Sequence, residues 1–533
     1  MNHGDEPIDI TSQLRLARQE FTEKLATIPL ANSVDGRTFS FQAPISLFLN
    51  PGDYVHMTTP DNAVYIGQVL DREVRQYDGP QVNIEDINHK KLDAAGFSIQ
   101  GASFHIKMTN LHGSGVILSG PTNTDSLGFE GASISSATID DIAALHDSWA
   151  ESNPTLTVGS LQATKGQFPA RINAAGFNRH TFMCGQSGSG KTYSLGVVLE
   201  QILLNTDLRV AVLDPNADYV RLHSATEKRL SAEDGSKESL LVQRYLDRTA
   251  DLKVFRPTVE EDSNAEALRI RFSDLSREDQ ANVLMLDPLQ DREEFDAFWR
   301  VVGKLPDRPF QLSDIHETAA NDLSHVTRQL LLRISNLGIR DWNVWAQRDE
   351  ASLSETLAGD WRSVVLDVSR FERPIERSVI ALATLRHFWN LRNDRKPVLL
   401  VIDEAHNVCP REPMDSIQAA ATELAIAIAG EGRKYGIYLL LSTQRPDKLH
   451  PNVVSQCDNL MLMRMNSQSD LQELQQVFSF VPPAILSESI AFRQGEALIA
   501  GPLTSSPMLT RFGQRISNEG GADVATTWTR IDT

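Results

Sequence analysis

A glycine-rich octapeptide carries the clearest chemical signal in this 533-residue sequence. Residues 185–192 read GQSGSGKT, which fits the phosphate-binding pattern GxxxxGK[ST] in full. The preceding HTFMC is typical of a buried strand and the following TYSLGVVLEQIL of a helix, which is the context that the motif requires. Glycines let the backbone wrap around a phosphate with its N–H groups pointing inward, and the helix N-terminus adds partial positive charge. The sequence therefore predicts a nucleoside triphosphate site.

The positions of this P-loop have definable tasks in nucleotide chemistry. Lys191 is expected to reach the β- and γ-phosphates of ATP, and the Thr192 hydroxyl is expected to bind Mg²⁺. ATP and Mg²⁺ are therefore the predicted cofactors. The predicted nucleotide contacts are Gly185, Gln186, Ser187, Gly188, Ser189, Gly190, Lys191, Thr192 and Tyr193.

A second signal is the run PVLLVIDEAH at residues 397–406, in which apolar residues lead directly into two acids. The carboxyl ends of strands are where α/β sheets bind ligands. Asp403 suits a contact to Mg²⁺ or its water, and Glu404 suits a general base that polarises the attacking water. A core strand that ends in solvated acids is the alternative, which the P-loop disfavours. The letters DEAH also occur in certain helicases, but the rest of that motif set is not apparent, and His406 is predicted to be structural.

A third segment, EGRKYGIYLLLSTQRP at residues 431–446, reads as a helix end followed by a strand. If this strand lies beside the Asp403 strand, Gln444 faces the γ-phosphate as a sensor. Arg433 precedes the strand, and a guanidinium there fits an arginine finger for the γ-phosphate of a neighbouring subunit. Arg433 and Lys434 fit equally well as cations at the C-terminal end of a helix. The residues alone leave both roles open.

Strands and helices alternate around these motifs, which predicts an α/β fold with a mainly parallel sheet covered on both faces. A stretch at about 218–360 is rich in charge and helix formers and reads as a helical insertion. Short alternating segments split by Gly, Pro, Asn and Asp precede the sheet and predict an all-β barrel. The predicted domains are a helix and arm at 1–35 (helix over 11–27), the barrel at 36–154, the P-loop ATPase core at 155–510 and an extended arm at 511–533.

The composition narrows the class of protein further. Acidic residues outnumber basic ones 70 to 51, which argues against a protein that coats DNA with its outer surface but not against a ring with a basic pore. No run of about 18 apolar residues occurs and the N-terminus lacks a signal-peptide pattern, so a cytoplasmic protein without membrane contact is expected. The three cysteines form no CxxC pair, which disfavours a zinc site or a disulfide framework.

Four segments resemble the HerA branch of the HerA/FtsK superfamily of ATPases. They are EGRKYGIYLLLSTQRPDKLHPNVVSQCDNLMLMRM, the approach NRHTFMCG to the P-loop, LDPNADY at 213–219 and the tail GQRISNEGGADV. A β-rich barrel before a RecA-like ATPase core with a helical insertion is also the architecture of that family. The resemblance implies a homo-hexamer that binds ATP at subunit interfaces and translocates double-stranded DNA through its pore.

The resemblance also implies roles for single residues. Arg179, just before the P-loop strand, matches a second arginine that contacts nucleotide, and Asp214 and Asp218 match acidic positions near the site. Many relatives have a glycine and then Glu where this chain has Ala217 and Asp218, which puts the role of Asp218 in doubt. The remaining matches are Lys191 and Thr192 for nucleotide and Mg²⁺, Asp403 and Glu404 for hydrolysis, Gln444 for sensing and Arg433 for the finger in trans.

Functions of different kinds remain open at this level. Rings of this family work with partners such as a nuclease or a sirtuin-like NAD-consuming enzyme, in DNA processing or anti-phage defence, with the barrel as the expected docking surface. A hexameric scaffold that organises an effector, with ATP regulating its assembly, is the alternative. A DNA pump at the membrane is disfavoured because no transmembrane segment is found.

Overall fold

The computed structural model describes residues 27–83, 103–121, 128–231, 233, 235–259, 265–305, 309–322 and 324–521. The helix expected over residues 11–27 therefore lies outside the described residues, apart from Thr27, and so does the end of the expected arm at 522–533. The chain forms two compact units, one of residues up to 149 with 482–488, and one of the remainder. All three cysteines are buried and free. Among the described residues, no helix has both the length and the apolar character needed to cross a bilayer.

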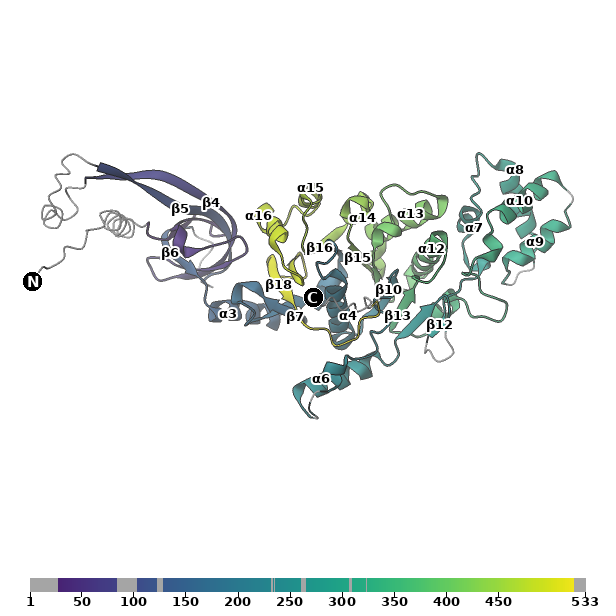
Figure 1. Ribbon diagram of the computed structural model, residues 1–533, viewed down its shortest axis with the longest axis horizontal. Coiled ribbons are helices and arrows are strands. Elements are labelled where there is room, and N and C mark those ends of the chain that lie inside the picture. Colours follow the sequence, from purple (N-terminus) through teal and green to yellow (C-terminus); the bar gives the residue numbers. More distant parts are fainter. Residues whose placement is uncertain are drawn as a thin grey trace, which may run out of the picture. The chain divides into compact units, whose positions relative to one another are not determined.

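The first unit is a closed barrel in the order β1-β2-β5-β4-β3-β6 (Figure 1). Burial alternates along β2, so that Phe39 and Phe41 point into an apolar core while their neighbours face outward. This period-two pattern is what gives a closed sheet one buried face. Strand β1 pairs with both β2 and β6, so the barrel starts before residue 36, the boundary suggested by the sequence. The strands are β1 (Leu30–Ser33), β2 (Thr38–Pro44), β3 (Tyr54–Thr58), β4 (Val64–Asn83), β5 (Ser103–Ser119) and β6 (Phe129–Ser136).

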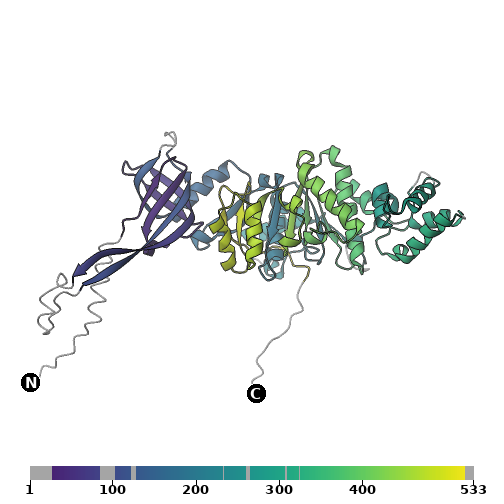
Figure 2. The ribbon, with the colours of Figure 1, turned by 90° about the horizontal axis from the view of Figure 1, so that it is seen from above.

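Strands β4 and β5 are much longer than the other barrel strands and continue beyond the barrel as a two-stranded ribbon (Figure 2). Helix α3 (Ile139–Glu151) follows the barrel in the chain. The short helix α16 (Pro483–Ser487) also belongs to the first unit, although it comes from a distant part of the sequence.

The second unit is built on a sheet in the order β12-β11-β13-β10-β14-β15-β9-β16-β17-β18-β7-β8. The strands from β12 to β16 in this order are parallel, and the last four form an antiparallel edge. Helix α4 lies on one face, with α12 and α13 on the other (Figure 1). Because both faces of the sheet are covered, β9, β13 and β14 are buried along their whole length, without alternation. The predicted α/β class is confirmed.

The elements of the second unit have the following bounds. The strands are β7 (Thr155–Leu161), β8 (Pro169–Asn173), β9 (His180–Cys184), β10 (Arg209–Asp214), β11 (Lys253–Arg256), β12 (Ala265–Ala267), β13 (Ser363–Asp367), β14 (Val398–Ile402), β15 (Ile437–Thr443), β16 (Cys457–Leu462), β17 (Glu496–Ala500) and β18 (Met508–Phe512). The helices are α4 (Lys191–Asn205), α5 (Glu227–Leu230), α6 (Lys237–Thr249), α7 (Arg277–Val283), α8 (Arg292–Val302), α9 (Leu312–Ala320), α10 (His325–Asn336), α11 (Leu353–Ala358), α12 (Pro374–Asn390), α13 (Ser416–Glu431), α14 (Pro451–Val454) and α15 (Gln468–Val477).

The region from 218 to 360 is not the single helical insertion that the sequence suggested. Strands β11 and β12 lie within it and extend the parallel sheet, and α6 packs against α4. Helices α8, α9 and α10 pack on one another. Their charged faces are held by ion pairs such as those from Arg333 to Asp291 and Glu294. The two strands were missed because their four and three residues are too short to show a periodic pattern.

Candidate active site

The P-loop joins β9 to α4, as the motif requires. Gly188 and Gly190 have φ values of 74° and 88°, a left-handed conformation that other residues rarely adopt. A Cβ at Gly185 would lie 2.7 Å from the Cβ of Met463, so only glycine permits this close packing. Because α4 starts at Lys191, its first N–H groups face the loop and create an anion-binding site.

Lys191 is the electrostatic centre of the site. Its side chain is 3% exposed, and its Nζ lies 2.7 Å from Oδ1 of Asp403 and 3.2 Å from Oε1 of Glu404. It also donates to Oγ of Ser442 at 2.9 Å. Burial alone would lower the pKa of this ammonium, but the two carboxylates outweigh it and raise the pKa above its usual value. Lys191 therefore stays charged and draws the acids of β14 to the P-loop.

The two acids after β14 are held in different ways. Oδ1 of Asp403 accepts from Lys191 and from Ser442 at 2.6 Å, while its Oδ2 is buried and has no hydrogen-bond partner among the described residues. Glu404 adopts a left-handed backbone with φ 45° and ψ 50°, which is costly for a residue with a side chain. Such strain is typical of functional positions, and here it turns the Glu404 carboxylate towards Lys191.

Gln444 follows β15, and β15 pairs with β14, so the strand of Gln444 lies beside the strand of Asp403 as predicted. The backbone N–H and the Nε2 of Gln444 donate to the two carboxylate oxygens of Glu404 at 3.3 and 2.9 Å. His406 lies 2.9 Å from Oγ1 of Thr443 and 3.3 Å from Glu404, and burial lowers the pKa of its ring. Gln444 and neutral His406 therefore orient Glu404 from two sides.

The end of β10 and the loop after it bring two further acids, Asp214 and Asp218, towards Asp403. Burial raises the pKa of Asp214 to about 7, although its carboxylate accepts backbone N–H groups from Asp218 and Tyr219. Burial and then the negative charge of Asp403 raise the pKa of Asp218 to about 6. Ala217 has a φ of 62°, a left-handed conformation that glycine adopts at lower cost. Both acids therefore titrate close to neutral pH beside the site.

The C-terminal segment, expected as an extended arm, is fastened to α4. Glu200, 1% exposed, accepts from the backbone N–H groups of Ile516 and Ser517 at 2.8 and 2.9 Å. It also forms an ion pair with buried Arg515, whose Nε lies 3.2 Å away. A Cβ at Gly196 would lie 2.5 Å from Cζ of Arg515, so glycine makes room for the guanidinium. These contacts make residues 515–517 a fixed part of the ATPase unit.

This segment also reaches the first turn of α4 and the loop after β10. The hydroxyl of Tyr193, a predicted nucleotide contact, accepts from the backbone N–H of Arg515 at 2.8 Å and so binds the tail. Gly520 donates its N–H to the carbonyl of Asp218 at 3.1 Å. A Cβ on Gly520 would overlap the carbonyl of Ala217. The Gly-Gly pair thus lets the tail pack beside the acidic loop.

The residues present suit a Mg²⁺ site completed by nucleotide. Mg²⁺ requires oxygen ligands, and the Thr192 hydroxyl and the unpartnered Oδ2 of Asp403 are suitable ones. The described residues contain no group of three or more His, Cys, Asp or Glu side chains that could hold a metal by themselves. This pattern fits Mg²⁺ sites in which phosphates and waters supply most ligands.

The two predicted arginines lie at the amino ends of the parallel strands, whereas the P-loop lies at their carboxyl ends. Arg179 directly precedes β9, and Arg433 lies in a short 3₁₀ turn (Gly432–Tyr435) directly before β15. Both contact Oδ2 of Asp458, Arg433 by a hydrogen bond of 2.5 Å and Arg179 at 3.4 Å. Arg433 is therefore brought together with Arg179, and neither meets Lys191, Glu404 or Gln444 of the same chain.

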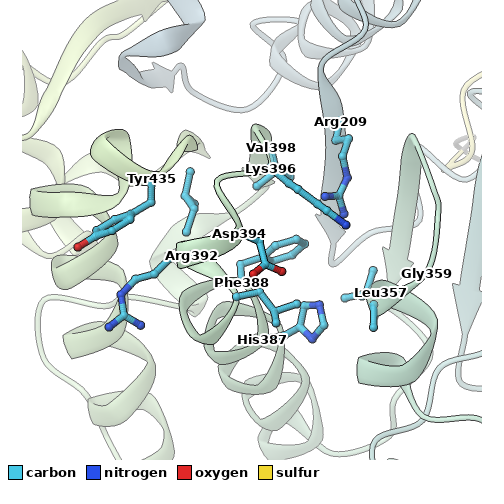
Figure 3. A pocket seen from close by; sticks show the side chains of 13 residues that line it. Arg209, Leu357, Gly359, His387, Phe388, Arg392, Asp394, Lys396, Val398 and Tyr435 are labelled. Atoms are coloured by element: carbon cyan, nitrogen blue, oxygen red, sulfur yellow. The ribbon is translucent and has the colours of Figure 1, made fainter.

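A pocket at the same amino ends of the strands adds further positive charge there. Arg209, Arg392 and Lys396 line it with the acid Asp394, and Figure 3 shows Arg209 and Lys396 directed to the same part of the pocket. Tyr435, two residues after Arg433, is also part of its wall. The amino-terminal edge of the parallel strands is thus rich in cations.

Sequence reasoning missed several members of the site. Ser442, a polar residue in an apolar strand, holds both Lys191 and Asp403. Arg464, a cation directly after an apolar run, lies against the P-loop and contacts the carbonyl of Gly188 at 3.4 Å. Glu200 is a lone charge in the apolar run GVVLEQILL. In each case, an isolated polar residue within or directly after an apolar run was the available signal.

The chain is similar to known proteins. Residues 156–339 match the family described as the central domain of helicase HerA, and residues 364–465 match the ATPase family associated with various cellular activities (AAA). The chain is 32% identical over 129 residues to the probable DNA double-strand break repair helicase HerA of Methanocaldococcus jannaschii, covering 24% of this chain and only 25% of that protein. It is 22% identical over 388 residues to the HerA of Sulfurisphaera tokodaii, covering 70% and 72%.

Among solved structures, VirB4 of Thermoanaerobacter pseudethanolicus is similar, with a TM-score of 0.46 and 15% identity over 67% of this chain and 96% of VirB4. The parallel sheet, the P-loop and the paired acids define a RecA-like P-loop ATPase, an enzyme that hydrolyses ATP. Within that class, the chain is similar to the HerA helicases over most of its length.

Proposed function

We propose that this chain is a Mg²⁺-dependent cytoplasmic motor that assembles as a hexameric ring and uses ATP to translocate double-stranded DNA through its pore. One observation supports the ring above all others: the P-loop and Glu404 lie at the carboxyl ends of the parallel strands, whereas Arg433 lies at their amino ends. The S. tokodaii relative is described as a DNA double-strand break repair helicase, which supports DNA as the substrate.

The separation of the two edges favours action between subunits. β9 has five residues and β15 has seven. At about 3.3 Å per residue, such strands keep their two ends about 15 to 25 Å apart. Arg433 therefore cannot reach a γ-phosphate held by Lys191 of its own chain. A neighbouring copy, placed head to tail, can supply it, and a repeated head-to-tail contact closes into a ring.

The charges at the two edges are complementary. Carboxylates gather at the carboxyl ends of the strands, where Asp214, Asp403 and Glu404 are buried. Cations gather at the amino ends, where Arg179 and Arg433 are joined by those of the pocket in Figure 3. Surfaces of opposite sign steer association and set the register of an interface. Head-to-tail packing is the arrangement that brings these two edges together.

We propose a task in hydrolysis for each residue of the site, and the geometry described above supports it. Glu404, oriented by Gln444, takes the proton of the attacking water. Lys191 turns from the carboxylates to the β- and γ-phosphates, whose negative charge its ammonium offsets. Thr192 and Asp403 hold Mg²⁺, which when bound neutralises charge on the phosphates. Gln444 donates to the Glu404 carboxylate, so as a sensor it would couple the presence of the γ-phosphate to the position of the base.

We also propose that the barrel carries an effector enzyme, such as a nuclease or a sirtuin-like NAD-consuming enzyme, in DNA processing or anti-phage defence. Ile45 and Phe48, at the turn after β2, are 47% and 72% exposed. Adjacent apolar side chains in solvent suit a contact with another protein. The barrel is therefore the part of the chain that we expect to meet this partner.

The motor function is tested by the ATPase rate with and without linear double-stranded DNA, on protein sized by light scattering. We expect a species of roughly 350 kDa, six times the 59.2 kDa chain, whose turnover rises several-fold when DNA is added. Circular single-stranded DNA serves as the control, because it has the same charge on each phosphate but forms no duplex. A ring whose turnover does not respond to duplex DNA would instead favour the scaffold function.

Mixing two inactive variants should restore activity if the site is shared. Arg433→Ala lacks the finger and Glu404→Gln lacks the base, so each alone should lose turnover. In an equal mixture, roughly a quarter of head-to-tail interfaces combine an intact base with an intact finger. We therefore expect ATPase activity to return on mixing. The control is Arg433→Ala mixed with the double variant Arg433→Ala/Glu404→Gln, in which no interface has a finger. If both mixtures stay inactive, Arg433 does not act between subunits.

A further inference from the structure

Asp458 occupies an irregular position at the start of β16. The register with β9 pairs Cys457 with His180 and Asn459 with Thr181, which leaves Asp458 as an extra residue in the strand. An extra residue of this kind turns its side chain out of the normal alternation and often lies beside a functional site. The bulge thus presents the Asp458 carboxylate at the edge of the sheet that carries the two arginines.

One oxygen of Asp458 binds both guanidinium groups. Oδ2 accepts from Nη1 of Arg433 at 2.5 Å and lies 3.4 Å from Nε of Arg179. The three side chains are 33%, 45% and 45% exposed for Arg433, Arg179 and Asp458. Each guanidinium has five N–H donors. Nη1 of Arg179 also donates to the carbonyl and the side chain of Asn178, and the remaining donors are available at the surface. Two cations around one carboxylate leave a net positive charge that can accept an anion.

The backbone beneath Arg179 is fixed by the residue after Asp458. Asn459 is fully buried, and its Nδ2 donates to the carbonyl of Gly176 at 2.9 Å and to Oγ1 of Thr181 at 3.1 Å. Its Oδ1 accepts from the N–H of Leu503 at 3.2 Å. Asp458 and Asn459 therefore act on the same turn, one from the surface and one from the core.

The backbone beneath Arg433 is fixed by two glycines. A Cβ at Gly432 would lie 3.0 Å from the carbonyl of Ile437, and Gly436 has a φ of 83°. The turn between α13 and β15 is consequently tight. Nearby His180 is buried, and burial together with the charge of Arg433 lowers the pKa of its ring to about 4. His180 is neutral near pH 7 and adds no charge to the cluster.

We propose that Asp458 is a positioning residue that holds Arg433 and Arg179 side by side as one clamp for the triphosphate of a neighbouring copy of this chain. The proposal rests on the proposed function, because the clamp acts only on a site in another subunit. Two guanidinium groups repel each other, and the shared carboxylate offsets this repulsion. A clamp aligned before the phosphate arrives stabilises the transition state without further reorganisation.

The first test is Asp458→Asn, which keeps the shape of the side chain and removes its charge. We expect kcat to fall about ten- to a hundredfold while KM for ATP, ring mass and thermal stability stay close to those of the unmodified chain. Asp458→Glu should recover much of the rate, because it restores the carboxylate. The matched control is Asp296→Asn, which removes an exposed ion pair to Arg300 in α8 and should leave kcat unchanged.

The second test separates a damaged clamp from a damaged fold. A chain with Asp458→Asn keeps its own P-loop and base, so mixing it with Glu404→Gln should restore turnover. Mixing it with Arg433→Ala should not, because both chains then lack a working clamp. Turnover within twofold of normal for Asp458→Asn, or no recovery with Glu404→Gln, overturns the proposal for Asp458. Failure of the proposed function is distinct, since it appears as normal turnover of Arg433→Ala itself.

Discussion

Glu404→Gln should lower ATP turnover by about 10²- to 10⁴-fold and leave nucleotide binding intact. The amide is nearly isosteric but cannot take the proton of the attacking water. It also removes one of the two negative charges that hold Lys191, at 3.2 Å in the present geometry. Lys191 is then freer to bind phosphate, so ATP affinity should be equal or higher.

Steady-state turnover and equilibrium binding of ATP, measured on the same preparation, separate these two effects. Glu412→Gln is the matched control, because Glu412 is an exposed glutamate in the loop between β14 and α13. It should leave turnover and binding unchanged. Normal turnover of Glu404→Gln would remove Glu404 from the role of base, and Asp218 would become the next carboxylate to examine.

Arg515→Ala should destabilise the ATPase unit by about 3–5 kcal/mol, because it leaves the buried Glu200 carboxylate without its counter-charge. Both side chains of this pair are at most 2% exposed. The backbone N–H groups of Ile516 and Ser517 still bind Glu200 but carry no net charge. The substitution should also weaken ATP binding, since the tail joins α4 to the loop that carries Asp218.

Thermal unfolding, followed together with ATP affinity, measures this effect. Arg300→Ala removes an exposed pair with Asp296 and should change stability by no more than about 1 kcal/mol. Combining Arg515→Met with Glu200→Gln should recover part of the lost stability, because no uncompensated charge then remains. Equal losses for Arg515→Ala and Arg300→Ala would show that the tail does not stabilise the unit.

Two acids, Asp214 and Asp218, and the C-terminal segment show why some features could be predicted only in part. The acidic positions 214 and 218 were matched to the site by resemblance, but their titration near neutral pH follows from burial and from the charge of Asp403. The tail was expected as an arm because its composition is polar and contains Gly-Gly. Its buried contacts arise from a charge in α4 more than 300 residues earlier in the chain.

By itself, the sequence determined the features that depend on neighbours in the chain. The strand, loop and helix of the P-loop, the acids that end β14 and the alternation of an α/β fold are all local patterns of residue type and spacing. Tertiary structure alone decided the rest. Lys191 meets Asp403 across 212 residues, Arg179 and Arg433 meet at Asp458, and short β1, β11 and β12 become strands by pairing. These contacts join distant segments, and their energies come from burial and charge proximity, which no local pattern encodes.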